Sequence, residues 1–183
     1  VKRVIIANQP IGAQAIDACF RALQLPGFEL YCLADGLEGL AMLADGARRN
    51  PPPAGNPLRV LVEIGFAGGR TGARSRDEAM AVARAIAAAD GLTLGGFECF
   101  EGLLPTPEAA DGLIDDVAAL AQSALAETLF APGQPVIVSA GGTAFFDRVG
   151  ERFNATSFGA PVVKVLRSGC YLTHDSVAYS ASF

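Results

Sequence analysis

Short apolar runs alternate with longer amphipathic stretches along the whole chain. The apolar runs are rich in β-branched residues and predict six strands, over 4–7, 28–34, 59–64, 92–99, 135–139 and 161–167. Apolar residues recur at helical spacing between them, over 12–25, 36–49, 76–89, 107–130 and 143–153. Asp35 and Ser75 each precede a helical stretch and can cap its first turn. The pattern therefore predicts alternating strands and helices from end to end.

This alternation predicts an α/β fold with a parallel sheet covered on both faces. Two architectures fit the pattern equally well, a doubly wound open sheet and a (β/α)8 barrel. The predicted strands are two fewer than a closed barrel needs. The chain is therefore either an open sheet or part of a barrel.

Composition narrows the class of protein. With 183 residues and just over half of them apolar, the chain can bury one sizeable core. A net charge of -5 and scattered arginines argue against nucleic-acid binding. No apolar run reaches the roughly 18 residues of a membrane span. The four cysteines form no CxxC pair, which predicts buried thiols in a reducing cytoplasm.

Two glycine-rich loops follow predicted strands, where parallel α/β proteins build their sites. The segment 65–72 holds four glycines and Arg70, whose guanidinium suits an anionic oxygen, although a flexible loop with a solvated arginine gives the same pattern. The segment 139–143 reads Ser-Ala-Gly-Gly-Thr before a helix. The backbone N–H groups of its glycines and the hydroxyls of Ser139 and Thr143 predict a site for an anion. The site is not a P-loop, because the lysine of that motif is absent.

Two further segments at strand ends carry candidate chemistry. Glu98 is either a partly buried acid or base with a raised pKa or an exposed loop carboxylate. The segment 166–175 repeats the pattern of a strand followed by small residues, and it fits the second half of a phosphate cradle. His174 is the single histidine, and beside one aspartate it is more typical of a structural residue than of a metal ligand.

These motifs together resemble the D-serine dehydratase and D-threonine aldolase family of pyridoxal 5′-phosphate (PLP) enzymes, which have an alanine-racemase-type barrel. The resemblance covers most of the chain. Its Ser-Gly-Cys-Tyr and Thr-His-Asp variants look closest to the amino-acid deaminase and D-serine-dehydratase-like members. It rests on residues 6–9, 62–63 with 68–72, 139–143, and 167–171 with 173–175.

The resemblance implies a (β/α)8 barrel with PLP at its mouth, and it assigns roles by motif. Arg70 would contact the phenolic oxygen of PLP, and Arg167 would lie at the pyridine nitrogen. The phosphate would lie between two groups of residues, Ser139, Gly141, Gly142 and Thr143 on one side and Ser168, Gly169 and Cys170 on the other. Glu98 and Tyr171 would line the pocket.

The chain also departs from the family pattern. The Schiff-base lysine motif of the first barrel strand is missing, and neither Lys2 nor Lys164 is placed to replace it. The C-terminal β domain, which in the family carries a divalent metal such as zinc, is missing as well. We therefore expect residues 1–183 to form a single domain, the central and C-terminal part of the barrel, that binds no metal itself.

The resemblance implies part of a PLP-dependent lyase acting on D-amino acids, either a dehydratase (deaminase) or an aldolase, with the isolated chain inactive. Two alternatives are a non-catalytic PLP-binding barrel and an unrelated α/β domain that binds a phosphorylated metabolite. Because a partial barrel exposes strand edges, we also expect association with the missing segments or with a second copy as a homodimer.

Overall fold

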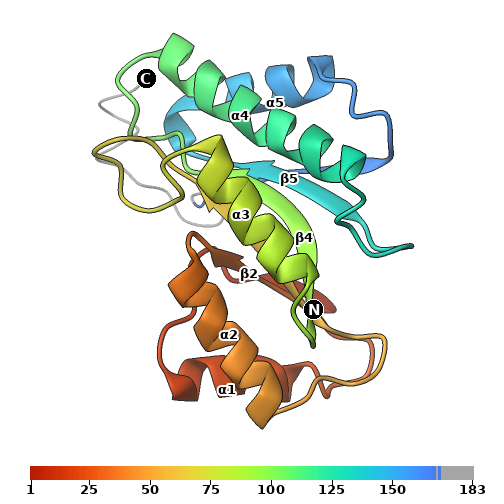
Figure 1. The fold of residues 1–183 in the computed structure, drawn as a ribbon. Helices are drawn as coiled ribbons and strands as arrows, with labels where there is room; N and C mark the ends of the chain where they lie inside the picture. The colour runs from red at the N-terminus through yellow and green to blue at the C-terminus, as the bar shows by residue number, and fades with distance from the viewer. Residues whose placement is uncertain (168, 170–183) are drawn as a thin grey trace.

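The computed structural model describes residues 1–167 and Gly169, and it alternates strands with helices throughout (Figure 1). The six strands are β1 (Arg3–Ile5), β2 (Glu29–Ala34), β3 (Leu58–Ile64), β4 (Leu92–Cys99), β5 (Val136–Ala140) and β6 (Val162–Leu166). The helices are α1 (Ala13–Ala22), α2 (Leu37–Arg49), α3 (Arg76–Ala87), α4 (Pro107–Ala126) and α5 (Phe146–Ala155), with a 3₁₀ turn, η1 (Thr143–Phe145), before α5.

The predicted elements are all present, with differences at their ends. Ser75 caps α3 as predicted, since its hydroxyl accepts a hydrogen bond from the Glu78 N–H. The predicted cap at Asp35 is wrong: Gly36 is the N-cap of α2, because the chain stays extended through Gly36 and no side chain caps the helix. Helix α4 ends before the predicted residue 130, and Thr128 then takes a positive φ of 57°.

Strand order decides between the two predicted architectures. The strands are parallel and lie in the order β1-β2-β3-β4-β5-β6. A doubly wound sheet reverses direction at a switch point, whereas a barrel adds each strand beside the previous one. The sheet is therefore a partial parallel barrel, and the doubly wound alternative is wrong.

The helices cover one face of this sheet, not two as the pattern predicted. All five helices contribute to one large apolar cluster with alternate strand residues. The other face carries a smaller cluster of strand residues alone, formed by Tyr31, Leu33, Leu61 and Ile137 with Ile5 and Val165 at its margin. We call this second surface the inner face. In an α/β barrel the equivalent surface lines the interior.

The described cysteines are buried thiols, as predicted. Cys19, Cys32 and Cys99 are all buried and unpaired, and burial raises the pKa of Cys32 and Cys99 above the usual thiol range. Cys170 lies outside the described residues. None of the helices in the described part of the chain is long and apolar enough to cross a membrane.

Candidate functional site

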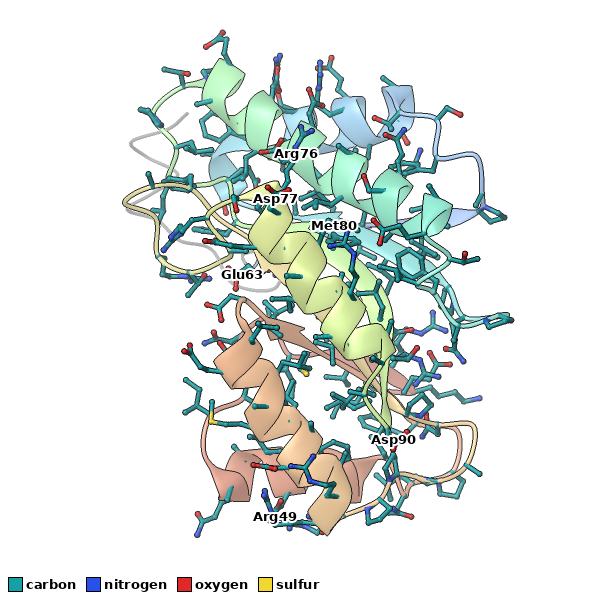
Figure 2. All side chains as sticks on the ribbon, viewed as in Figure 1. Arg49, Glu63, Arg76, Asp77, Met80 and Asp90 are labelled. Atoms are coloured by element: carbon teal, nitrogen blue, oxygen red, sulfur yellow. The ribbon has the colours of Figure 1, made fainter. Side chains whose placement is uncertain are left out.

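Polar side chains form a row across the inner face at the carboxyl ends of three neighbouring strands. Glu63 of β3 pairs in register with Glu98 of β4, which pairs with Ser139 of β5. All three are buried, and they lie two residues beyond the apolar row of Leu61 and Ile137. Figure 2 shows Glu63 near the start of α3, with Asp90 at the opposite end of that helix. The polar row therefore marks the carboxyl-end mouth of the sheet.

A bulge in β4 turns Glu98 toward this face. Leu94 pairs with Val60, but the next pair joins Gly96 to Leu61, so Gly95 is an extra residue in β4. Strict alternation from the outward-packed Leu94 would send Glu98 outward as well, toward the helices. The extra residue reverses this alternation. The sequence carried a signal for it, since paired glycines inside a strand often mark a bulge.

Arg167 closes the polar row just after β6. Its Nε donates to Ser139 Oγ at 2.8 Å, and its Nη2 donates to Glu98 Oε2 and, at 3.4 Å, to the Cys99 carbonyl. Ser139 Oγ in turn donates to the Val165 carbonyl at 2.9 Å. The guanidinium is thus fixed by its contacts with β4 and β5, and the Ser139 hydroxyl serves mainly to hold it.

Glu98 is buried, which excludes the exposed-carboxylate reading. Burial raises its pKa to about 8, because desolvation of the carboxylate outweighs the attraction of Arg167, and Glu63 adds repulsion. One carboxylate oxygen bonds Arg167, while Oε1 is buried with no hydrogen-bond partner among the described residues. Orphaned buried oxygens are rare and call for an explanation such as a bound ligand.

The loop after β3 is held in place rather than free. Arg74 Nη1 donates to the carbonyls of Phe66 at 2.9 Å and Thr71 at 2.7 Å, and the Thr71 hydroxyl bonds Glu63. Arg70 extends from this loop as an exposed side chain over the Phe100 ring, 4.9 Å from its centroid. The structure therefore positions Arg70 through a cation–π contact at the mouth.

The two glycines after β5 bring bare backbone to the same mouth. A Cβ on Gly141 would lie 2.6 Å from the backbone of Arg167, and one on Gly142 would lie 2.4 Å from Gly102 Cα. Their N–H groups bind a carboxylate from the chain itself: Glu101 accepts from Gly141 at 3.1 Å and from Gly142 at 2.6 Å. These amides therefore bind a carboxylate of the chain itself, and the anion site that the pattern predicted for this loop stays a prediction.

Most of the predicted site residues come together at this mouth. Those brought together there are Arg70, Glu98, Ser139, Gly141, Gly142 and Arg167, with Thr143 directly after them at the start of η1. Gly169 is described and exposed. Three predicted residues lie outside the described part of the chain: Ser168, Cys170 and Tyr171. No role was predicted for Glu63 or Phe100, and the contact of Glu101 with Gly141 and Gly142 was not predicted either.

Neither lysine is placed to act at the mouth. Lys164 pairs with Val138, which packs in the helix-covered cluster, and its Nζ donates to Asn154 Oδ1 of α5 at 3.1 Å. Lys2 precedes β1, at the opposite end of the strands. In the described part of the chain, no group of three or more His, Cys, Asp or Glu side chains could hold a metal ion.

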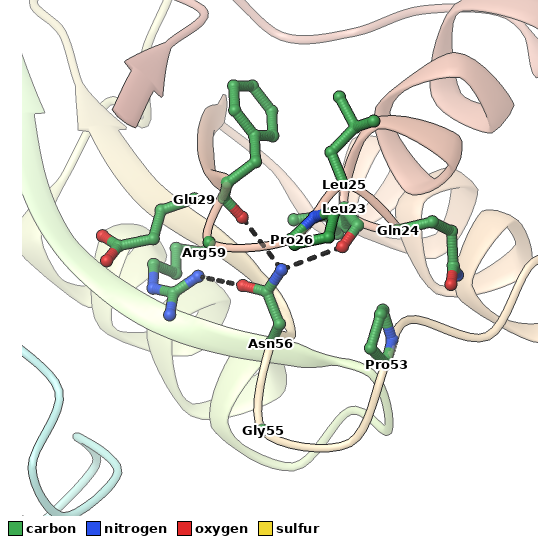
Figure 3. Close-up of a pocket in the computed structure, with 11 residues that line it drawn as sticks. Leu23, Gln24, Leu25, Pro26, Glu29, Pro53, Gly55, Asn56 and Arg59 are labelled. Carbon is green, nitrogen blue, oxygen red and sulfur yellow. Dashed lines mark hydrogen bonds between the residues drawn. The ribbon is translucent and has the colours of Figure 1, made fainter. Parts of the chain in front are cut away.

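An open cavity lies at the other end of the sheet and is a poor candidate site. It has a volume of about 340 Å³ and is lined by the loops before β2 and β3 (Figure 3). Its central polar group, Asn56, donates to the carbonyls of Leu23 at 3.0 Å and Phe28 at 2.9 Å, and accepts from Arg59 at 3.0 Å. Asn56 is thus satisfied by the protein itself. Active sites of parallel barrels form at the carboxyl ends of strands, not here.

This chain is similar to 3-hydroxy-D-aspartate aldolases, which confirms the resemblance read from the motifs. It is 28% identical over 147 residues to 3-hydroxy-D-aspartate aldolase of Paracoccus denitrificans (strain Pd 1222). That match covers 78% of this chain but 36% of the aldolase, so the chain spans about a third of that relative's length. No known family profile matches the chain.

Several solved structures share the fold of this chain. D-threonine aldolase from Filomicrobium marinum has a TM-score of 0.62 at 21% identity, over 91% of this chain and 42% of that one. D-threo-3-hydroxyaspartate dehydratase from Delftia sp. HT23 has a TM-score of 0.52 at 24% identity, over 85% of this chain and 39% of that one. PipY of Synechococcus elongatus PCC7942, solved with PLP bound, has a TM-score of 0.53 at 12% identity, over 90% and 91% of the two chains.

Proposed function

We propose that this chain forms part of the cofactor-binding barrel of a PLP-dependent lyase that cleaves or dehydrates 3-hydroxy-D-amino acids. The observation that carries the proposal is one mouth where bare glycine amides, a fixed arginine and an orphaned carboxylate oxygen converge. The names of the relatives support the substrate class. Because this chain covers only part of each relative, the activity is proposed for the protein as a whole.

The described residues fit a phosphorylated aromatic cofactor. Glycine is required at 141 and 142, where a side chain would collide with backbone, and such bare amides suit a phosphate. We infer that Gly141, Gly142 and Thr143 hold the phosphate, with Ser168, Gly169 and Cys170 on its other side. Arg70 would bind the phenolic oxygen and Arg167 the pyridine nitrogen, with Ser139 acting through its bond to Arg167.

PLP, when bound, withdraws electrons from the bonds at the substrate's Cα. The residues of this chain would orient the cofactor and hold a proton beside it. Arg167 is fixed on two sides, so it presents its charge without reorganisation. Glu98, with its pKa raised to about 8, can hold a proton at Oε1 near neutral pH. The lysine that binds PLP covalently in such enzymes would lie outside this chain, since neither Lys2 nor Lys164 is at the mouth.

Loss of Arg70 tests the assignment of the site. We expect Arg70→Ala to weaken PLP binding by roughly tenfold or more, because a charge-assisted contact to the phenolic oxygen is lost. The free energy of unfolding should stay within about 0.5 kcal/mol, because Arg70 is exposed. Arg21→Ala is the matched control, since Arg21 is an exposed arginine at the end of α1. PLP absorbance titration gives both affinities; equal affinity in the two variants would refute this site.

The products distinguish the two reactions and a second candidate. Carbon–carbon cleavage of a 3-hydroxy-D-amino acid releases an aldehyde, whereas dehydration ends in ammonia and a keto acid. The second candidate is a PLP-binding barrel without turnover, favoured by the match to PipY over 91% of that chain. In an assay of the whole protein, PLP binding with neither product, for D-threonine, D-serine and 3-hydroxy-D-aspartate, would favour this second candidate.

A further inference from the structure

The amides of Gly141 and Gly142 are occupied by an internal anion. The Glu101 side chain is fully buried, and its two oxygens accept from these successive N–H groups at 3.1 and 2.6 Å. Among the described residues, no arginine or lysine forms an ion pair with this carboxylate. A desolvated carboxylate held by two neutral donors is compensated less fully than one that also meets a cation.

Close packing of the two loops leaves no room for a second anion beside Glu101. A Cβ on Gly142 would lie 2.4 Å from Gly102 Cα and 3.0 Å from Glu101 Oε1, and a Cβ on Gly102 would lie 2.9 Å from Gly142 Cα. A phosphate bound to the same N–H groups would meet the Glu101 carboxylate at contact distance. Two negative charges that close, away from water, repel strongly.

We propose that Glu101 is the resident anion of the Gly141–Gly142 cradle and that a phosphate-bearing ligand binds there by displacing it. The proposal rests on the function proposed above and makes Glu101 a residue that sets affinity. The Arg167 backbone lies against Gly141 beside the cradle, while its guanidinium is directed to Ser139 and Glu98.

The turn after Glu101 gives the carboxylate a route out of the cradle. The turn is held to Glu101 by one hydrogen bond, from the Leu104 N–H to the Glu101 carbonyl at 2.9 Å. Leu103, Pro105 and Thr106 are exposed, with Leu103 at 60%. Of this turn, Leu104 packs against the helix-covered cluster, so a shift of the turn disturbs that core at one partly buried residue. Helix α4 begins at Pro107 with Thr106 as its N-cap, so the shift that we propose involves residues 102–105.

Removal of the resident charge is the direct test. We expect Glu101→Gln and Glu101→Ala to bind both inorganic phosphate and PLP about tenfold more tightly or better, since no anion has to leave first. Glu108→Gln is the matched control, because it removes the same charge from an exposed residue at the start of α4. The control should bind both ligands as the parent does. Isothermal titration at fixed ionic strength measures the affinity of the parent and of each variant for both ligands.

A second measurement on the parent protein does not depend on the variants folding. With 13C-labelled glutamate carboxyls, phosphate should shift the Glu101 carboxyl resonance as its two N–H bonds are lost. Binding of phosphate with that resonance unmoved, or folded Glu101 variants with parental or weaker affinity, would overturn the proposal and leave the PLP site standing. Failure of the parent and every variant to bind PLP would instead refute the proposed function, and this inference with it.

Discussion

Glu98 shows how burial, charge and hydrogen bonding compete at a single residue. Its carboxylate bonds Arg167 through one oxygen, yet the other oxygen is buried without a described partner. Desolvation is the largest influence on its pKa, and the nearby carboxylates of Glu63 and Glu101 reinforce it, while Arg167 and Arg70 oppose it. The balance favours the protonated acid over a wide range of pH. Such a carboxyl stabilises the fold less once it ionises.

This balance predicts an unusual dependence of stability on pH. The pKa of Glu98 rises from 4.5 to about 8 on folding, so between these values the native state binds the extra proton. Stability contributed by Glu98 is therefore highest at the low end of this window and falls as pH rises toward 8. Glu98→Gln cannot ionise and lacks this loss. We expect it to gain roughly 1–3 kcal/mol on the parent between pH 5 and pH 8.

Urea unfolding at the two pH values measures this difference. Glu108→Gln, at an exposed position on α4, serves as the control and should follow the parent at both pH values. A difference between Glu98→Gln and the parent that is constant from pH 5 to pH 8 would mean that Glu98 has an ordinary pKa in the folded protein.

At the scale of elements, the site depends on the bulge in β4. Gly96 has a φ of 146°, and a Cβ there would lie 1.8 Å from the Ile137 carbonyl oxygen of β5. Gly95, the extra residue, has its nearest neighbours at 3.4 Å, which is ordinary contact. The two adjacent glycines thus have different tasks. Gly95 supplies the shift that turns Glu98 inward, and Gly96 lets β5 approach.

The same pair offers a matched test of this close approach. Gly96→Ala should lower the free energy of unfolding by roughly 2–4 kcal/mol, because the strained φ and the collision with backbone cannot both be relieved. Gly95→Ala should cost less than about 1 kcal/mol. Chemical denaturation of both variants measures the difference. Equal costs would show that β4 and β5 are not held at this distance by Gly96.

The sequence predicted the elements well because their signals are local. Periodicity located every strand and helix, and the Ser75 cap follows from one side chain and its neighbours. The bulge at Gly95 was not predicted, since it depends on which residue of β3 each residue of β4 meets. Glu101 was missed for the same reason: its partners, Gly141 and Gly142, lie about forty residues away.

At the scale of the whole molecule, the two ends of one sheet differ in what their polar groups still lack. At the amino ends, Asn56 and Arg59 bond each other and nearby carbonyls around the cavity of Figure 3. At the carboxyl ends, Glu98 has an orphaned oxygen and Glu101 has no described cation. Cavity volume alone would place a ligand site at the amino ends of the strands, whereas the unsatisfied charged groups place it at the carboxyl ends. Alternation of strands and helices left the architecture open, and strand order settled it.

Amide hydrogen exchange with PLP compares the two ends directly. We expect PLP to slow exchange in peptides covering 98–102 and 139–145, because a ligand at the mouth orders the backbone of both loops. Peptides covering 23–29 and 53–59, which line the cavity at the other end, should exchange at the same rate with and without PLP. The protein is thus its own control, since both regions are reported in one experiment. Protection confined to 23–29 and 53–59 would instead place the site at the amino ends of the strands. It would contradict the assignment that we made from the unsatisfied polar groups at the mouth.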